Sequence, residues 1–244
     1  MQGILAAERL PMPAPTPEAA PAAVGSAPAA GKSRRRAGRP VARILDQHGI
    51  TTAALELISS KGYDGLTMAA LARSLGVAPS ALYNHVSSKD DVLVLLEDHL
   101  AAMVDVSAFG KEPWEAAVRR WAWSYRDVFS EHTPLIPIIA VLPVANAPKT
   151  LAMYEAVTAG FRDAGFPEER IISAIVALEA FVFGAAYDVT APEDIFDAGN
   201  LAEDVPNFTS AVDRLSLAGH ERPTDAAFSL GLEALIAGFG AMRA

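Results

Sequence analysis

The sequence contains no cysteine, which excludes disulfide bonds, thiolate nucleophiles and cysteine-ligated zinc sites. It also lacks long hydrophobic runs. The longest apolar stretch, LIPIIAVLPVA at 135–145, is too short and too interrupted by proline to cross a bilayer. The first 31 residues hold no uninterrupted apolar core of the kind found in signal peptides. We therefore expect a cytoplasmic protein without a membrane-embedded segment.

Signatures of catalysis are missing as well. The five histidines lack the His-Glu-x-x-His spacing of zinc hydrolases, and the chain has no Gly-x-Ser-x-Gly turn and no phosphate-binding glycine loop. The acidic stretch 188–206 lacks the ligand spacing of a calcium loop. Glu97, Asp98 and His99 are consecutive on a predicted helix, so their side chains point in different directions. The sequence predicts neither an enzyme nor a protein that holds a metal or a cofactor.

Charge is divided unevenly along the chain. Residues 1–43 carry seven basic and two acidic residues, a net charge of +5, whereas the remainder carries −14, for a total of −9. Residues 1–31 are rich in alanine and proline and are predicted to be disordered. Residues 32–43, KSRRRAGRPVAR, form a basic arm that can contact phosphates or enter a minor groove, although a solvated tail explains the same composition. The candidate DNA contacts in this arm are Arg34, Arg35, Arg36, Arg39 and Arg43.

Residues 67–89, TMAALARSLGVAPSALYNHVSSK, predict two short helices joined by a tight glycine turn. Thr67 can cap the first helix, Gly76 stands where a helix stop needs a left-handed residue, and Pro79 suits the first position of the second helix. An inward leucine on the second helix leaves its polar residues free to face a DNA groove. Lys89 begins the next helix, where an ammonium group and backbone amides can bind a phosphate. This spacing is typical of a helix-turn-helix DNA-binding unit.

Most of the remaining chain follows helical spacing. Helices are expected at 46–61, 88–105, 113–131, 168–188 and 224–241, with broken helix or turn at 134–148. The helix at 113–131 holds three tryptophans, which either pack a core or line a cavity for a flat apolar molecule. The helices at 168–188 and 224–241 are apolar around most of their circumference. Each must therefore be covered on a second side, most simply by a second copy of the chain.

The run 55–93, LELISSKGYDGLTMAALARSLGVAPSALYNHVSSKDDVL, closely resembles the DNA-binding region of TetR-type transcriptional repressors. Weaker similarity to the regulatory domain of the tetracycline-repressor branch extends to residue 241. The resemblance implies an all-α protein, with a three-helix helix-turn-helix DNA-binding domain at 44–104 and a helical effector-binding and dimerisation domain at 105–244. It also implies a four-helix dimer interface and a palindromic DNA operator.

Together, these features predict a homodimeric transcriptional regulator. The simplest form is a repressor that leaves its operator when a small hydrophobic or aromatic effector binds, and activation is compatible with the same sequence. A DNA-binding architectural or adaptor protein without an effector is the alternative. Ile139 stands where the resemblance implies a metal-chelating histidine, and Trp121 replaces a polar drug contact. Both departures argue against tetracycline with magnesium as the effector.

Three sets of residues are predicted to carry these roles. The candidate contacts to double-stranded DNA outside the arm are Thr67, Ser80, Ala81, Tyr83, Asn84, His85 and Lys89. Of these, Asn84 is expected to read adenine and Ala81 to touch a thymine methyl group, while phosphates supply much of the affinity. The candidate effector contacts are Trp121, Tyr125, Phe129, His132 and Phe181. The candidate dimer-interface residues are Ile175, Phe183, Leu232, Leu235 and Phe239.

Overall fold

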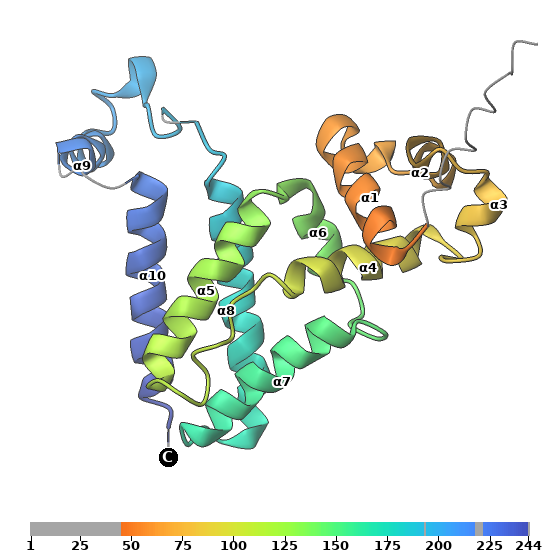
Figure 1. Cartoon of the computed structure of the whole chain (residues 1–244). Helices are drawn as coiled ribbons and strands as arrows, with labels where there is room; N and C mark the ends of the chain where they lie inside the picture. Colours follow the sequence, from red (N-terminus) through yellow and green to blue (C-terminus); the bar gives the residue numbers. More distant parts are fainter. Residues whose placement is uncertain (1–44, 193, 218–221, 244) are drawn as a thin grey trace, which may run out of the picture. The chain divides into compact units, whose positions relative to one another are not determined.

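The computed structural model describes residues 45–192, 194–217 and 222–243, and within these ranges the chain is helical without β-strands (Figure 1). The predicted all-α class is therefore confirmed. The arginines predicted to bind DNA from the basic arm lie outside the described residues. The N-terminal helices are α1 (Gln47–Lys61), η1 (Tyr63–Gly65), α2 (Met68–Leu75), α3 (Pro79–Leu82) and α4 (Lys89–Ala101). The C-terminal helices are α5 (Trp114–Ser130), η2 (Thr133–Leu135), α6 (Ile136–Ile139), α7 (Pro148–Asp163), α8 (Glu168–Asp188), η3 (Gly199–Leu201), α9 (Pro206–Leu217) and α10 (Pro223–Gly240).

α1 begins at a capped residue and buries one face. The Asp46 carboxylate accepts a hydrogen bond of 2.8 Å from the Gly49 amide, which satisfies one of the amides left free at a helix start. Ile50, Ala54 and Ile58 recur every four residues and are buried. Because this face packs against α2 and α4, α1 braces the helix-turn-helix.

α4 packs against both parts of the chain, with α1 on one side and with α5 and α7 on another. Ser88 and Asp91 form a reciprocal capping box at its start. The helix was expected to continue to residue 105 but ends at Ala101. The backbone there changes to hydrogen bonds between residues three apart, such as the one that the Val104 amide donates to the Ala101 carbonyl. Val104 itself is buried. Because one helix serves both parts, the division near residue 104 stays a prediction.

α7 is a helix that the sequence pattern did not predict. It follows directly on the proline-rich segment, in which only the short η2 and α6 form. Its larger buried side chains, Met153, Val157 and Phe161, recur every four residues, and the positions between them are mostly small or polar. A stripe this narrow gives a weak periodic signal. Packing against α4 and α8 therefore determines this helix.

α5 packs against α8 and α10 in the C-terminal part (Figure 1). Two arginine–carboxylate pairs join α5 to α10. Arg119 donates two hydrogen bonds to Glu233, of 2.5 Å from Nε and 2.8 Å from Nη2, at the surface. Arg126 is only 1% exposed, pairs with Asp225, and lies 4.8 Å from the centre of the Trp123 ring. The second pair therefore joins a buried guanidinium to a partly exposed carboxylate, and the buried charge depends on its partner.

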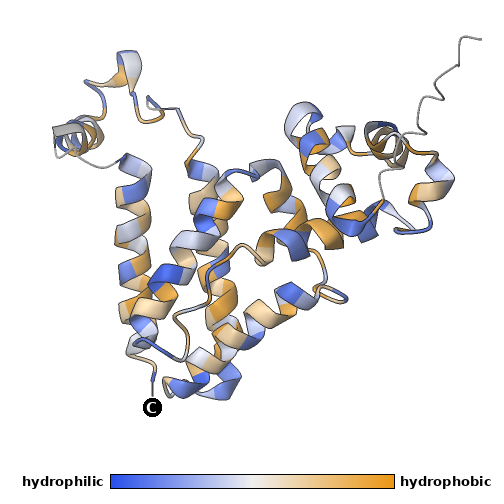
Figure 2. Ribbon diagram, in the orientation of Figure 1, coloured by the Kyte–Doolittle hydropathy of each residue, from blue (hydrophilic) through white to orange (hydrophobic). Residues whose placement is uncertain are grey.

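α8 and α10 are more apolar than a helix with one buried face needs to be. Figure 2 shows hydrophobic residues recurring along both helices. By length and composition alone, α8 could cross a membrane, yet 39% of its apolar window is buried inside the protein, where it packs against α5 and α7. Exposed apolar side chains remain on both helices, including Ile172 and Val176 on α8 and Leu230 on α10. Each helix thus has one covered and one uncovered apolar face.

Candidate nucleic-acid interface and effector site

α2, the turn that follows it and α3 form a helix-turn-helix. Thr67 caps α2 by accepting a hydrogen bond of 3.1 Å from the Ala70 amide. Gly76 ends α2 in the left-handed region, at φ 70° and ψ 27°, where a glycine has no steric cost. Pro79 occupies the first turn of α3, where a missing N–H leaves no helical hydrogen bond unmade. The predicted cap and turn are therefore confirmed.

α3 is a single turn, and residues 83–85 continue it as hydrogen-bonded turns. Leu82 and Val86 are buried and hold this segment in place. Tyr83 is 51% exposed, which leaves its hydroxyl and ring available to a phosphate or sugar. Among the other predicted DNA contacts, Ser80, Asn84 and His85 are exposed and Ala81 is half-buried.

Lys89 is held in a defined position at the start of α4. Its Nζ lies 3.6 Å from the centre of the Tyr63 ring and donates a hydrogen bond of 3.4 Å to the Tyr63 carbonyl oxygen. A cation–π contact and one hydrogen bond orient the ammonium group, and its other N–H donors can bind a phosphate. η1, which carries Tyr63, thus positions a predicted DNA contact, a role that the sequence pattern did not indicate.

A cluster of buried aromatic rings, the aromatic cluster, lies between α5 and α8. It consists of Trp121, Tyr125 and Phe129 on α5 and Phe183 on α8. The Phe183 ring packs edge-on against Tyr125 and Phe129, with ring centres 5.5 and 5.1 Å apart, and Trp121 lies 5.5 Å from Tyr125. The three α5 rings are almost completely buried. Three of the five predicted effector residues are therefore neighbours.

Two phenylalanines on α8 have different neighbours. Phe183, expected at a dimer interface, belongs to the aromatic cluster. Phe181, expected to contact an effector, instead stacks on Phe228 of α10, with ring centres 5.3 Å apart and 10° between the planes. Its ring lies against Gly231, where an added Cβ would approach it to 2.6 Å. The two residues have different neighbours because residues two apart on a helix point to nearly opposite sides. Both are half-buried, and both assignments stay predictions.

His132 and Ile139 lie beyond the end of α5. His132 is half-buried, and burial lowers the pKa of its imidazole. Within the described residues, no ring contact joins it to the aromatic cluster, so its effector role stays a prediction. Ile139 is buried and apolar. In the part of the chain that the structure describes, no three histidine, aspartate or glutamate side chains are placed to hold a metal ion.

Two carboxylates are buried beside the aromatic cluster. Glu179 of α8 is 8% exposed and accepts hydrogen bonds of 2.7 Å from the Tyr154 hydroxyl and 3.2 Å from the Tyr125 hydroxyl. Glu97 of α4 is 5% exposed, and its Oε2 has no hydrogen-bond partner. Burial, followed by the charges of Asp98 and Glu179, raises the pKa of Glu97 to about 7. Burial also raises the pKa of Glu179, against the opposing effect of its two tyrosine donors.

The three consecutive residues of α4 reach three different neighbours. Glu97 faces the buried carboxylate and tyrosines. Asp98 accepts hydrogen bonds of 2.6 and 3.1 Å from the first two amides of α7. His99 places its ring 6.2 Å from the ring of His48 on α1. The three side chains point in different directions, as expected. Through them, α4 contacts the surroundings of the aromatic cluster, α7 and the DNA-binding unit.

The sequence reading missed Glu97, Tyr154 and Glu179 as site residues. Glu179 is the one charged residue between Arg170 and Asp188 in a helix that is otherwise almost wholly apolar. Because a charged side chain is rarely buried without a function or a partner, that position was a usable signal. No comparable signal marked Tyr154, because it lies on the unpredicted α7.

The predicted dimer residues divide between core and surface. Ile175 and Leu232 are 1% and 0% exposed inside their own protomer, so these two assignments need correction. Leu235 and Phe239 are half-buried on α10. The exposed apolar side chains are instead Ile172, Val176 and Tyr187 on α8 and Leu230 on α10. They are accompanied by small exposed residues at Ala177, Ala180, Gly184, Ala234, Ala237 and Gly238.

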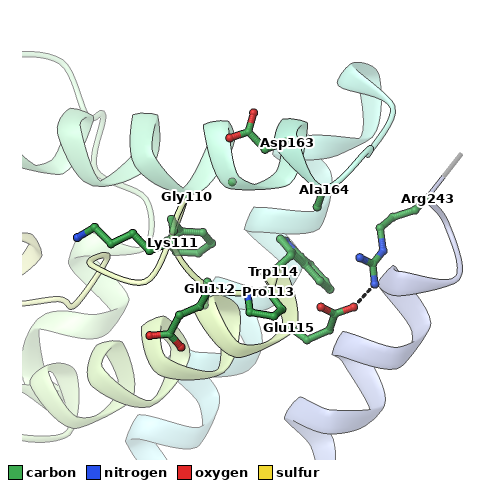
Figure 3. Close-up of a pocket in the computed structure, with 12 residues that line it drawn as sticks. Gly110, Lys111, Glu112, Pro113, Trp114, Glu115, Asp163, Ala164 and Arg243 are labelled. Carbon is green, nitrogen blue, oxygen red and sulfur yellow. Dashed lines mark hydrogen bonds and ion pairs between the residues drawn. The ribbon is translucent and has the colours of Figure 1, made fainter.

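A separate cavity of about 440 Å³ lies where the start of α5, the end of α7 and the C-terminal segment meet (Figure 3). Trp114 forms part of its wall, and Arg243 pairs with Glu115 beside it. None of the predicted effector residues lines this cavity. Its charged rim suits an apolar effector less well than the aromatic cluster does.

The chain matches two family models. Residues 50–96 match the model for bacterial regulatory proteins of the tetR family, and residues 108–243 match the tetracyclin repressor-like C-terminal domain. The first match contains α2, α3 and Lys89, and the second contains the aromatic cluster. The second match alone covers more than half of the chain.

Individual relatives agree with both matches. An HTH-type transcriptional regulator of Saccharopolyspora erythraea is 32% identical over 142 residues, which are 58% of this chain and 60% of that protein. The class G tetracycline repressor protein of Vibrio anguillarum is 29% identical over 219 residues, 82% of this chain and 96% of the repressor. The TetR family protein ActR of Streptomyces coelicolor, solved with actinorhodin, has a TM-score of 0.66 at 28% identity, over 82% of this chain and 98% of ActR.

These relatives are named as a transcriptional regulator and as a repressor. The helix-turn-helix of α2 and α3, the helical C-terminal part and both family models lead to the same assignment. The chain is a helix-turn-helix transcriptional regulator that belongs to the tetR family of bacterial regulatory proteins, with a tetracycline-repressor-like C-terminal domain.

Proposed function

We propose that this regulator is a homodimeric cytoplasmic repressor, which binds a palindromic operator and leaves it when a small hydrophobic or aromatic effector enters the C-terminal part. The observation that carries the proposal is the position of α4. Its His99 faces α1 of the DNA-binding unit, while its Glu97 is buried beside the aromatic cluster. An event at the cluster therefore acts directly on the helix that supports the DNA-binding unit.

On the DNA side, the exposed residues after Pro79 enter the major groove and those near Lys89 contact the phosphates. Tyr83 and Lys89 supply contacts that do not depend on base sequence, whereas Asn84 offers the bidentate geometry that suits adenine. No arginine lies between Arg73 and Lys89, so guanine contacts from this segment are scarce. We therefore expect phosphates and the basic arm to supply much of the affinity.

The dimer forms through the uncovered faces of α8 and α10. Ile172, Val176 and Leu230 are 60%, 56% and 76% exposed in one protomer, and small residues around them allow two helices to approach closely. Exposed apolar side chains in this number are usual at interfaces and costly in water. A two-fold dimer presents two copies of α3, which places the operator half-sites about one helical turn apart, ~34–36 Å.

The effector occupies the region of the aromatic cluster. The structures and names of relatives support a small-molecule ligand, since ActR has been solved with actinorhodin and one relative is a class G tetracycline repressor protein. For release, the effector must bind the conformation with low DNA affinity more tightly than the DNA-bound conformation. Contact with Glu97 gives it a direct route to move α4.

The experiment that tests this function is selection and sequencing of genomic DNA fragments retained by the purified protein at near-physiological salt. Non-specific complexes dissociate under these conditions, whereas specific ones persist. We expect a short palindrome near a small number of promoters, and the neighbouring genes then indicate the effector class. Recovery of fragments without a common motif would contradict the repressor and favour an architectural or adaptor protein.

A further inference from the structure

We infer that the effector of the repressor proposed above is an aromatic or lipophilic amine, whose protonated nitrogen binds between Glu97 and Glu179 while its apolar part lies against the aromatic cluster. This inference rests on the proposed function and assigns a chemical class to the ligand. It is carried by buried carboxylates that lack a cation, by a carboxylate oxygen without a partner, and by the aromatic rings nearby.

Glu97 and Glu179 are both more than nine-tenths buried, yet neither takes part in an ion pair among the described residues. The buried cation of the C-terminal part, Arg126, is committed to Asp225 and packs on Trp123. A carboxylate removed from water without a partner is unfavourable, because its solvation is lost and nothing replaces it. The site therefore carries negative charge that a bound cation would stabilise.

Glu97 Oε2 is buried without a hydrogen-bond partner in the described structure. Glu97 lies close enough to Tyr125, Tyr154 and Glu179 for its charge to act on each of them. Buried polar groups are normally satisfied, so an unpartnered carboxylate oxygen in such a cluster indicates an absent donor. An ammonium group supplies up to three N–H donors, which is enough for two carboxylates and one hydroxyl.

The surroundings favour an amine over other donors. Tyr125 contacts Glu179 through its hydroxyl, and its ring packs against Trp121. Aromatic faces attract cations as well as apolar surface. An anionic effector would bring a like charge against Glu97 and Glu179. A neutral alcohol could donate one hydrogen bond but would leave the charge of the pair without compensation.

The groups that face Glu97 are Asp98 on its own helix, Tyr125 on α5, Tyr154 on α7 and Glu179 on α8. None of them is a cation. Because burial and like charges raise the pKa of Glu97 to about 7, a fraction of this carboxyl group is protonated at neutral pH. An arriving ammonium group would favour the ionised form, so binding should release a proton to the buffer.

The test uses three ligands that share one ring: cationic naphthylmethylamine, neutral naphthylmethanol and anionic naphthoate. Each is titrated calorimetrically into the full chain at neutral pH, in two buffers of different ionisation enthalpy. We expect the amine to bind at least about tenfold more tightly than the alcohol, and the alcohol more tightly than the acid. Only the amine should show a buffer-dependent heat that reports proton release.

Two variants locate the preference. Glu97→Gln should reduce the preference for the amine over the alcohol and reduce proton release, because Glu179 alone then faces the nitrogen. Glu155→Gln, on the exposed side of α7, removes the same charge and should change neither. Because the wild-type comparison needs no variant, a misfolded Glu97→Gln protein does not rescue the inference. Equal affinity of amine and alcohol, no saturable binding of the amine, or an undiminished amine preference in a folded Glu97→Gln protein would each overturn it.

Failure of this inference is distinguishable from failure of the proposed function. A protein that selects a palindrome but shows no amine preference remains a repressor with an effector of another class. A protein that prefers the amine but selects no palindrome has the site without the proposed function.

Discussion

The DNA-binding unit, α1 to α3, and the C-terminal part, α5 to α10, treat polar groups in opposite ways. Among the described residues of α1 to α3, every charged side chain is at least partly exposed, and the buried Thr51 bonds to the Gln47 carbonyl of its own helix. The C-terminal part buries Arg126 and Glu179, and α4 adds Glu97 at the boundary. A surface that binds phosphates needs accessible polar groups, whereas a ligand site needs polar groups kept from water.

The largest effect should come from the uncovered apolar face. Val176→Arg places a charge in the proposed interface twice per dimer, once from each subunit, and should weaken dimerisation by about 4 kcal/mol or more. Sedimentation equilibrium measures the change. Val141→Arg introduces the same charge at another exposed valine and should leave the dimer intact. A Val176→Arg protein that remains dimeric would show that these helices are not the interface.

The two ion pairs between α5 and α10 should differ sharply in their contribution to stability, because only one of them contains a buried charge, that of Arg126. Asp225→Ala leaves the Arg126 guanidinium buried without its partner and should lower the free energy of unfolding by about 3 kcal/mol. Glu233→Ala disrupts the exposed Arg119 pair and should lower it by less than about 1 kcal/mol. Urea denaturation of both variants measures the difference. Similar losses of unfolding free energy in the two variants would mean that burial does not determine how much these ion pairs contribute to stability.

Glu97 should make stability depend on pH. Its pKa rises from 4.5 to about 7 on folding, so the folded chain binds a proton that the unfolded chain has lost between these values. Stability is therefore present in full below pH 4.5 and falls as pH rises through 7. In wild type, the free energy of unfolding should fall by up to about 3 kcal/mol over this pH range, since one pKa unit corresponds to about 1.4 kcal/mol. Glu97→Gln should remove this fall. Urea denaturation of wild type and Glu97→Gln at pH 5 and pH 8 measures the change, with Glu155→Gln as the control. An equal pH dependence of wild type and Glu97→Gln would show that the pKa of Glu97 is not raised on folding.

Substitutions in the DNA-binding unit should have smaller and separable effects. Tyr83→Ala or Lys89→Ala should weaken binding to all sequences, and Lys89→Ala should lower the salt slope by about one. Asn84→Ala should relax preference at one base pair by about 1–3 kcal/mol. Fluorescence anisotropy on operator and scrambled DNA separates the two patterns. Lys111→Ala removes an exposed cation outside the DNA-binding unit and should change neither the overall affinity for DNA nor the base preference. Identical behaviour of all the variants would contradict the assigned roles.

The same contrast explains what could be predicted from the sequence. Thr67, Gly76 and Pro79 act through local caps and turns, so their positions in the chain were sufficient. In the C-terminal part, the separation of Phe181 from Phe183 depends on which neighbouring helix covers each side of α8, and periodicity alone does not reveal this. The contacts of Glu179 likewise involve Tyr154 on α7, a helix defined by packing.

The central claim, that two copies of the DNA-binding unit are held one helical turn apart, can be measured directly. Because the chain has no cysteine, Arg73→Cys gives a single exposed labelling site on α2. Pulsed electron spin resonance of the spin-labelled protein on a selected operator should give one narrow distance near ~34–36 Å, adjusted for the label arms. Absence of dipolar coupling between labels, or a distance that no pair of successive major grooves can accommodate, would contradict the account.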